Sequence, residues 1–205
     1  MTENTDEKIE KNQFTGYIEN DIVILIDQEA IDEFYNTSYI GILEVEQEGE
    51  ARLILNPIEV LLLFERNRIL VYHNNDIAKE QYSFEEILTH FSQYDDNLWQ
   101  KYIIYMDLRK RGYIVRAGYG EGIEFRVYKR GADIEKDSAK YLIYPVFEGS
   151  PIELRDLDKI SRVALGSRKD LIVATVDRQS KPIYYSVNKF EIINNVEIRD
   201  EDYAR

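Results

Sequence analysis

The chain has 205 residues, of which 44% are hydrophobic and 32% are charged, a composition typical of a globular protein. It contains no cysteine and only two histidines, His73 and His90. This composition excludes disulfides, thiolate metal sites and cysteine nucleophiles, and it argues against a histidine-built metal site. No apolar run approaches the ~18 residues of a membrane span, and the polar, acidic start argues against a secretory signal. We therefore expect a cytoplasmic protein with no cofactor, no metal and no membrane partner.

The charge is divided unevenly along the chain. The net charge is −13, which by itself argues against a nucleic-acid partner. Residues 1–100, however, carry 6 lysines and arginines against 22 aspartates and glutamates, a net charge of −16, whereas residues 101–205 carry 20 against 17, a net charge of +3. This asymmetry indicates two units with different partners, and the alternative is simply a solvated acidic surface on the first half.

The first half is predicted to be a small acidic α+β domain over residues 13–96, preceded by a disordered segment at 1–12 that is polar and lacks periodicity. Apolar runs of strand length occur at 21–26, 42–45, 52–55 and 69–72. Helices are expected after three capping residues, Asp27, Asn56 and Ser83, the first of them running through Phe34.

The second half is predicted to be an α/β domain with a mixed sheet over residues 97–195, followed by a tail at 196–205. A helix from Leu98 to about Lys110 could join the halves. One further helix is expected at 157–165, ended by Gly166. The strand candidates are 113–117, 124–128, 141–146, 171–176 and 183–187.

The strand Glu124–Tyr128 places a tyrosine where it could do chemistry. Alternation puts Phe125 and Val127 on the core face, and Arg126 and Tyr128 on the opposite, polar face. Tyr128 is then expected to expose a hydroxyl that could donate a proton. Because the chain has 16 tyrosines, a purely structural role is the commoner alternative.

Several basic residues of the second half could contact RNA. Lys169 immediately precedes a buried strand, where it could be aimed at a phosphate. Arg162 lies on a helix and could stack on a base through its planar guanidinium. The cluster Arg109–Arg111, followed by Arg116, is either an RNA contact or a set of cations favoured at a helix C-terminus. Each of these side chains could instead be an ordinary solvated one.

Taken together, these residues resemble the catalytic domain of tRNA-intron endonucleases. Four blocks occur in the family's order and spacing, namely Tyr105–Tyr113 with its D-L-R-x-R-G-Y pattern, Phe125–Tyr128, Lys140–Ile143, and Arg162–Ala164 with Arg168–Lys169. The first half is similar to the family's N-terminal domain through 54–72 and 82–88, so the resemblance covers roughly residues 14–195. It implies a restriction-endonuclease-like fold for the second half.

The resemblance also implies a reaction. Family members cut RNA by attack of a ribose 2′-hydroxyl on the adjacent phosphorus, which leaves a 2′,3′-cyclic phosphate and a 5′-hydroxyl without a metal. The family assigns this chemistry to a tyrosine, a histidine and a lysine. The tyrosine matches Tyr128 and the lysine matches Lys169, but the histidine position, just before Ala139–Leu142, holds Ser138.

The expectation that this chain does not cut RNA depends on Ser138. An imidazole with a pKa near 6.5 accepts a proton at neutral pH and a serine hydroxyl does not, and general acid–base help is typically worth ~10²–10⁴ in rate. The neighbouring Asp137 is expected to point to the opposite face of a strand, and His73 and His90 lie in the other half. We therefore predict a structural, non-cutting subunit that pairs with a catalytic subunit, two copies of each, on bulge–helix–bulge junctions of precursor tRNA.

The resemblance further predicts how RNA and subunits are held. Two arginines of related enzymes pinch a base; one matches Arg162, and the other falls near Tyr184, an aromatic that could still stack on a base. Arg116 and Arg126 are further candidate RNA contacts. Homologues carry an acidic docking loop where this chain has the mixed-charge turn Asp177–Lys181, so docking by this turn is not expected. The strand at 183–187, or the stretch at 191–193, offers an edge for pairing between subunits.

Two alternatives remain open from the sequence. The chain could be an active endonuclease subunit that uses Tyr128 and Lys169 with a substitute base. It could also be a protein-interaction module on a nuclease-like fold, with no RNA role.

Overall fold

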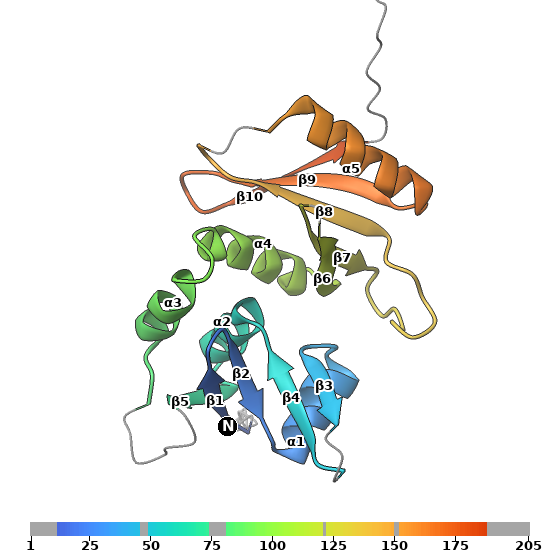
Figure 1. Cartoon of the computed structure of the whole chain (residues 1–205). Helices are drawn as coiled ribbons and strands as arrows, with labels where there is room; N and C mark the ends of the chain where they lie inside the picture. Colours follow the sequence, from blue (N-terminus) through green and yellow to red (C-terminus); the bar gives the residue numbers. More distant parts are fainter. Residues whose placement is uncertain (1–11, 46–48, 74–80, 121, 150–151, 188–205) are drawn as a thin grey trace, which may run out of the picture.

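A computed structural model describes residues 12–45, 49–73, 81–120, 122–149 and 152–187. Within these ranges the chain forms two five-stranded sheets, one from each half (Figure 1). The predicted disordered start, apart from residue 12, the predicted tail at 196–205 and the candidate edge at 191–193 lie outside the described residues.

The N-terminal sheet has the strand order β3-β4-β2-β1-β5. Its strands are β1 (Phe14–Glu19), β2 (Ile22–Leu25), β3 (Ile42–Val45), β4 (Ala51–Leu55) and β5 (Ile69–His73). β1 and β5 run parallel, and the other neighbouring strands are antiparallel. The predicted strands at 42–45 and 52–55 are confirmed as β3 and β4, which pair antiparallel.

The first helix of this half is longer than predicted. Asp27 caps it as expected, with its carboxylate accepting from the backbone N–H groups of Glu29 and Ala30. The helix starts as α1 (Gln28–Ala30) and continues as the π-helix η1 (Ile31–Thr37), so it passes the predicted end.

The two other predicted caps of this half are confirmed. The side chains of Asn56 and Glu59 each accept from the other residue's backbone N–H in a capping box at the start of α2 (Pro57–Glu65), with proline at the first turn. Ser83 begins α3 (Phe84–Ser92) through a capping box of the same kind. Such local patterns are readable from sequence because both partners lie within one helical turn.

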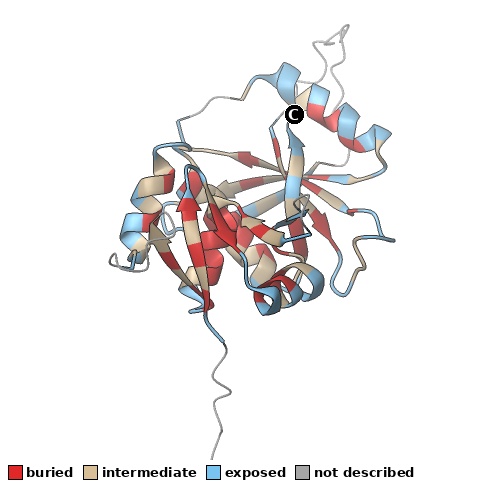
Figure 2. Cartoon of the chain, turned by 60° about the horizontal axis from the view of Figure 1, so that its bottom comes forward, coloured by how far each residue is buried: buried red, intermediate tan, exposed pale blue. Residues whose placement is uncertain are grey.

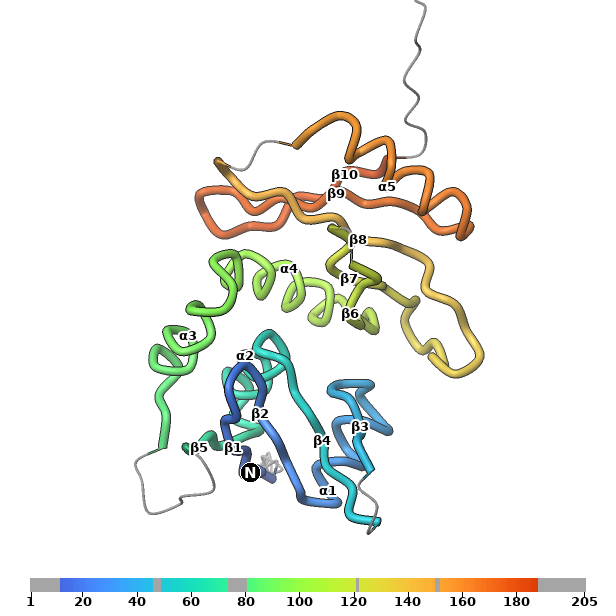
Figure 3. The backbone as a smooth tube through the Cα atoms, in the orientation of Figure 1, coloured from blue at the N-terminus to red at the C-terminus, as the bar shows by residue number. Residues whose placement is uncertain are grey.

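Helix α4 (Leu98–Lys110) has the predicted bounds and lies between the two sheets (Figures 1 and 3). Its residues Tyr102, Ile104 and Leu108 belong to a buried cluster that reaches from Phe14 in β1 to Ala174 in β9. Many of the buried residues accordingly lie on the elements where the halves meet (Figure 2). The two halves therefore share one hydrophobic core.

The C-terminal sheet has the order β10-β9-β8-β7-β6, with only β8 and β9 parallel, which confirms the predicted mixed sheet. Its strands are β6 (Ile114–Gly120), β7 (Ile123–Tyr128), β8 (Tyr141–Val146), β9 (Asp170–Val176) and β10 (Pro182–Val187). Helix α5 (Leu154–Gly166) connects β8 to β9 and covers the face opposite α4 (Figure 1). No helix within the described ranges has the length and apolar character needed to cross a membrane.

A clasp of arginines joins the halves. The Nη2 atom of Arg109 donates to the carbonyl oxygen of Ser38 at 2.8 Å. The Nη1 atom of Arg116 donates to the carbonyl oxygens of Tyr39 at 3.0 Å and Gly41 at 2.8 Å. Both arginines come from the second half and the three carbonyls from the first, so these bonds hold the halves together.

Gly41 fits the clasp because it has no side chain. Its φ of +82° lies in the left-handed region, and a Cβ atom there would stand 2.5 Å from Cδ1 of Leu53. Its N–H donates to Glu59 at 3.0 Å. A larger residue would therefore disturb both the backbone and the packing on β4.

Candidate functional site

Three neighbouring strands of the C-terminal sheet, β7, β8 and β9, have ends that lie side by side. Val127 of β7 pairs with Tyr141 of β8, and Tyr141 pairs with Asp170 of β9. Tyr128 therefore ends β7 beside the start of β8, and Lys169 immediately precedes β9. The sheet thus brings Tyr128 and Lys169, which match the tyrosine and lysine roles, to the same end of its strands. Ser138 lies on the segment that leads into β8.

Tyr128 is buried, which differs from the exposed hydroxyl that strand alternation predicts. Its side chain is only 7% exposed and clusters with Ile114 and Ala139. Tyr39 from the first half, together with Ala132 and Ile134 from the segment after β7, packs against this cluster. The polar face of β7 is therefore covered at this end by parts of the chain that a single-strand pattern does not reveal.

Lys169 is half-buried at the C-terminal end of α5. Its backbone N–H donates to the carbonyl of Ala164 at 2.9 Å, and its Nζ atom donates to the carbonyl of Ser167 at 3.2 Å. The preceding residue, Arg168, has a φ of +56°, a left-handed conformation common where helices end. The ammonium group is thus directed by a local bond to the end of the helix.

Ser138 is exposed and lines a cavity of about 480 Å³. The cavity is lined by Lys129–Ala132, Asp137–Lys140 and Arg168, and we refer to it as the loop cavity. Asp137 was expected to lie in a strand, which is wrong. It lies in the loop before β8, where its Oδ2 atom accepts from the N–H of Asp133 at 2.9 Å.

Both histidines belong to the first half. His73 ends β5, where its ring stacks on Tyr82 with 6.3 Å between centroids. His90 lies on α3, and its Nε2 atom is 2.6 Å from the carbonyl oxygen of Asn20. Neither histidine lines the loop cavity.

Arg116 and Arg126, predicted to contact RNA, are engaged within the protein. Arg116 forms the clasp described above. The Nε atom of Arg126 donates to the carbonyl of Ala117 at 2.7 Å, and its guanidinium lies 4.8 Å from the ring centroid of Tyr119. The structure therefore gives Arg116 a structural role, and Arg126 stacks on its own hairpin.

Tyr184 and Arg162 lie in different surroundings. The hydroxyl of Tyr184 donates to Asp107 of α4 at 2.8 Å, and the guanidinium of Arg111 lies 5.5 Å from its ring. Burial and the bond to Asp107 raise the pKa of Tyr184. Arg162 is 75% exposed and pairs with Asp158 one turn earlier at 2.9 Å, a surface pair of small energetic value.

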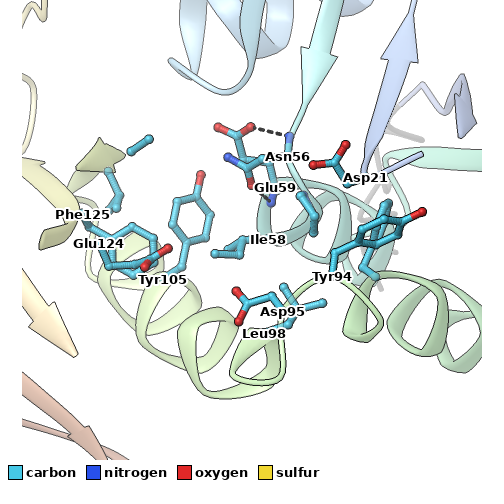
Figure 4. A pocket seen from close by; sticks show the side chains of 14 residues that line it. Asp21, Asn56, Ile58, Glu59, Tyr94, Asp95, Leu98, Tyr105, Glu124 and Phe125 are labelled. Atoms are coloured by element: carbon cyan, nitrogen blue, oxygen red, sulfur yellow. Dashed lines mark hydrogen bonds between the residues drawn. The ribbon is translucent and has the colours of Figure 1, made fainter. Parts of the chain in front are cut away.

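A second cavity, of about 300 Å³, lies between the halves (Figure 4). Its walls combine apolar residues with carboxylates, which come from Asp21, Glu59, Asp95 and Glu124. Burial raises the pKa of Glu59, against the opposing effect of its hydrogen bonds from Gly41 and Asn56. The hydroxyl of Tyr105 is buried there without a hydrogen-bond partner in the described part of the chain. The carboxylates make this cavity unsuitable for RNA, in contrast to the cationic loop cavity.

The four cations of the loop cavity are functional candidates that the sequence reasoning did not single out. Lys129 and Arg130 directly follow β7, Lys140 precedes β8, and Arg168 lies between α5 and β9. The signal available in the sequence was that basic residues flank three strands at the same end. That signal becomes meaningful only when the sheet order is known.

Comparison with known proteins identifies the family of this fold. The sequence matches the tRNA intron endonuclease N-terminal domain over residues 14–88 and the tRNA intron endonuclease catalytic C-terminal domain over residues 98–185. These two matches correspond to the two sheets with their helices. The chain belongs to the tRNA intron endonuclease family.

Relatives match over most of both chains. The tRNA-splicing endonuclease of Thermococcus kodakarensis is 36% identical over 83% of this chain and 95% of its own length. That of Thermococcus gammatolerans is 35% identical over the same shares. That of Methanococcus maripaludis is 31% identical over 89% of this chain and 97% of its own length. The resemblance read from the motifs is thereby confirmed.

Proposed function

We propose that this chain is the structural, non-cutting subunit of a heteromeric tRNA-splicing endonuclease. The complex recognises bulge–helix–bulge junctions of precursor tRNA and leaves 2′,3′-cyclic phosphate and 5′-hydroxyl ends. A second, histidine-bearing subunit supplies the cutting site. The observation that carries the proposal is Ser138, which stands where the family's chemistry needs a proton-accepting imidazole.

Three structural features support this role. The loop cavity beside Ser138 is lined by no histidine, and both histidines lie on the first half. Tyr128 is 7% exposed and clusters with Ile114 and Ala139, with Ile134 and Tyr39 packed against it. The retained pair Tyr128 and Lys169 then serves packing and local structure.

The sheet edge supports assembly with another subunit. Among the described strands, β10 is the outermost of the C-terminal sheet, and an outer edge of this kind can pair with a strand of another chain. Ile183 and Tyr185 on this strand are 40% and 55% exposed, although both are large apolar side chains. We propose that the catalytic subunit covers this strand in an assembly of two copies of each chain.

The test is reconstitution with a histidine-bearing homologue from the same cell. The purified chain alone should not cut a bulge–helix–bulge RNA, and the mixed complex should. Tyr128→Phe and Lys169→Ala in this chain should leave cleavage by the complex unchanged, whereas replacing the partner's histidine should abolish it. Robust cutting by the chain alone that is lost in Tyr128→Phe or Lys169→Ala would show an active subunit instead. A complex that neither cuts nor binds the RNA would favour an interaction module.

A further inference from the structure

The loop cavity concentrates positive charge on an otherwise acidic protein. Four of its lining residues are cations, namely Lys129, Arg130, Lys140 and Arg168, and one, Asp137, is an anion. The chain as a whole has a net charge of −13. A patch of one sign on a surface of the opposite sign attracts ligands selectively to that spot. The charge of this cavity therefore favours an anionic ligand.

Two cations of the cavity, Lys129 and Arg168, are not paired with a carboxylate of any described residue. Their side chains also form no hydrogen bond with any described residue. Arg130 and Lys140 rest on aromatic rings: the guanidinium lies 5.5 Å from the ring centroid of Tyr113, and the ammonium lies 4.9 Å from that of Tyr141. An aromatic face positions a cation and leaves its charge available.

The fold fixes three of these cations close to one another. Lys140 is held between β7 and β9, because its N–H donates to the carbonyl of Val127 at 2.9 Å and its carbonyl accepts from Asp170 at 3.0 Å. Lys129 follows β7 on one side, and Arg168 precedes β9 on the other. The cavity is thus built on the ends of ordered strands, which favours a defined binding geometry over a diffuse charged surface.

The other cations predicted for RNA binding are mostly engaged elsewhere. Arg116 holds the two halves together, and Arg126 bonds to its own hairpin. Arg162 pairs with Asp158. Within the described residues, the loop cavity brings four cations to one open space.

We propose that the loop cavity binds a backbone phosphate of the RNA and holds it without cleaving it. Lys129 and Arg168 supply the main charge contacts, and the Ser138 hydroxyl donates a hydrogen bond to a phosphate oxygen, as neutral hydroxyls commonly do in nucleic-acid complexes. Ser138 cannot act as the base for cleavage, but its hydroxyl can donate a hydrogen bond, so it suits a site that binds phosphate without cutting. This inference rests on the proposed function, because it takes the ligand to be the RNA of the complex.

The test is RNA binding by the reconstituted complex over a range of salt concentrations. The RNA carries 2′-deoxy groups at the junctions, so that binding is measured without cutting. The double variant Lys129→Gln/Arg168→Gln should bind roughly tenfold more weakly or worse, and the slope of log affinity against log salt should shrink by about 1, because one phosphate loses its cationic contacts. The charge-conserving Lys129→Arg/Arg168→Lys should bind much as the wild type does.

The matched control removes the same charge from a different place. Arg155→Gln/Lys159→Gln changes two exposed cations on the first half of α5, and binding should fall no more than about twofold. Equal losses from the two double variants would show general electrostatics and overturn the proposal, as would no loss from either. If inorganic phosphate stabilises the wild type but not Lys129→Gln/Arg168→Gln, while both bind RNA equally, the cavity takes free phosphate and not RNA. Failure of the wild-type complex to bind RNA would instead contradict the proposed function.

Discussion

The guanidinium of Arg116 reaches across the boundary between the halves and donates to the carbonyl of Gly41 at 2.8 Å. The same nitrogen also donates to the carbonyl of Tyr39 at 3.0 Å. Arg116 is therefore a structural residue, although its place in a basic stretch near a nuclease-like motif suggests RNA binding.

Replacing Arg116 with glutamine should destabilise the protein. Hydrogen bonds from a charged donor are typically worth about 1.5–3 kcal/mol each, and the carbonyls of Tyr39 and Gly41 would lose their partner. We expect the free energy of unfolding to fall by about 3–6 kcal/mol, measured by denaturant titration. Arg162→Gln, which removes an exposed arginine with one surface ion pair, should cost less than about 1 kcal/mol. Equal losses in the free energy of unfolding for the two variants would contradict the stabilising role of Arg116 between the halves.

Restoring the imidazole should restore cutting to this chain. Ser138→His places a group with a pKa near 6.5 in the loop cavity. Tyr128 and Lys169 lie at the same end of the sheet, on β7 and just before β9, the strands on either side of β8. We expect the rate of cleavage of a bulge–helix–bulge RNA to rise by at least about 10², the lower end of general acid–base catalysis. Ser138→Asn is the control, since it adds a polar side chain that cannot accept the proton. No difference between the two variants would mean that the burial of Tyr128, and not position 138, limits the reaction.

Alanine substitutions at two glycines distinguish the cost of backbone strain from the cost of a steric clash. Gly41 and Gly49 have similar φ angles, +82° and +85°, but a Cβ atom would strike Leu53 only at Gly41 and meets nothing within 4 Å at Gly49. Both alanine variants should lose about 1–2 kcal/mol from the left-handed backbone. Gly41→Ala should lose a further ~1–3 kcal/mol from overpacking. Thermal and denaturant unfolding of the two variants measures the difference, and similar losses would rule out the tight packing on β4.

Alkaline pH should weaken the fold through buried phenols. Burial raises the pKa of Tyr102, Tyr105 and Tyr184 above the ordinary value of about 10. Above that value the unfolded chain releases these protons while the folded chain keeps them, so the free energy of unfolding falls as the pH rises. The stabilisation is complete below pH 10 and is lost above it.

Tyr184→Phe tests this pH dependence at one site. It removes the hydrogen bond to Asp107, so we expect a loss of about 1 kcal/mol at neutral pH. The fall in stability above pH 10 should also become shallower, measured by denaturant titration at several pH values. Tyr119→Phe, at a tyrosine that is 56% exposed, should change neither quantity. An unchanged alkaline slope in Tyr184→Phe would contradict the assignment.

Local features of the fold were predictable from the sequence, and long-range ones were not. The capping residues Asp27, Asn56 and Ser83 bond to partners two or three residues away, so both partners of each hydrogen bond lie within one short stretch of sequence. The order of the strands depends on pairings between distant segments. The sequence therefore predicted a mixed sheet, but it did not show that Tyr128 and Lys169 lie at the same end of the strands.

The site differed from expectation for the same reason. Tyr128 was predicted to be exposed because alternation describes one strand in isolation, whereas Tyr39, which packs against its cluster, belongs to the other half of the chain. Arg116 bonds to a carbonyl 77 residues away, which no local pattern reports. The cations of the loop cavity come from three segments and form a group only in the folded chain.

The common core of the two halves limits how this protein can be rebuilt. Phe14 and Ala174 belong to one buried cluster with α4 between them, so each sheet depends on the other half to bury the face that packs against α4. A chimera that takes its first half from one relative and its second half from another must therefore match the α4 surface on both sides. Natural variation in the family should follow the same constraint, with changes on the two faces of α4 occurring in concert.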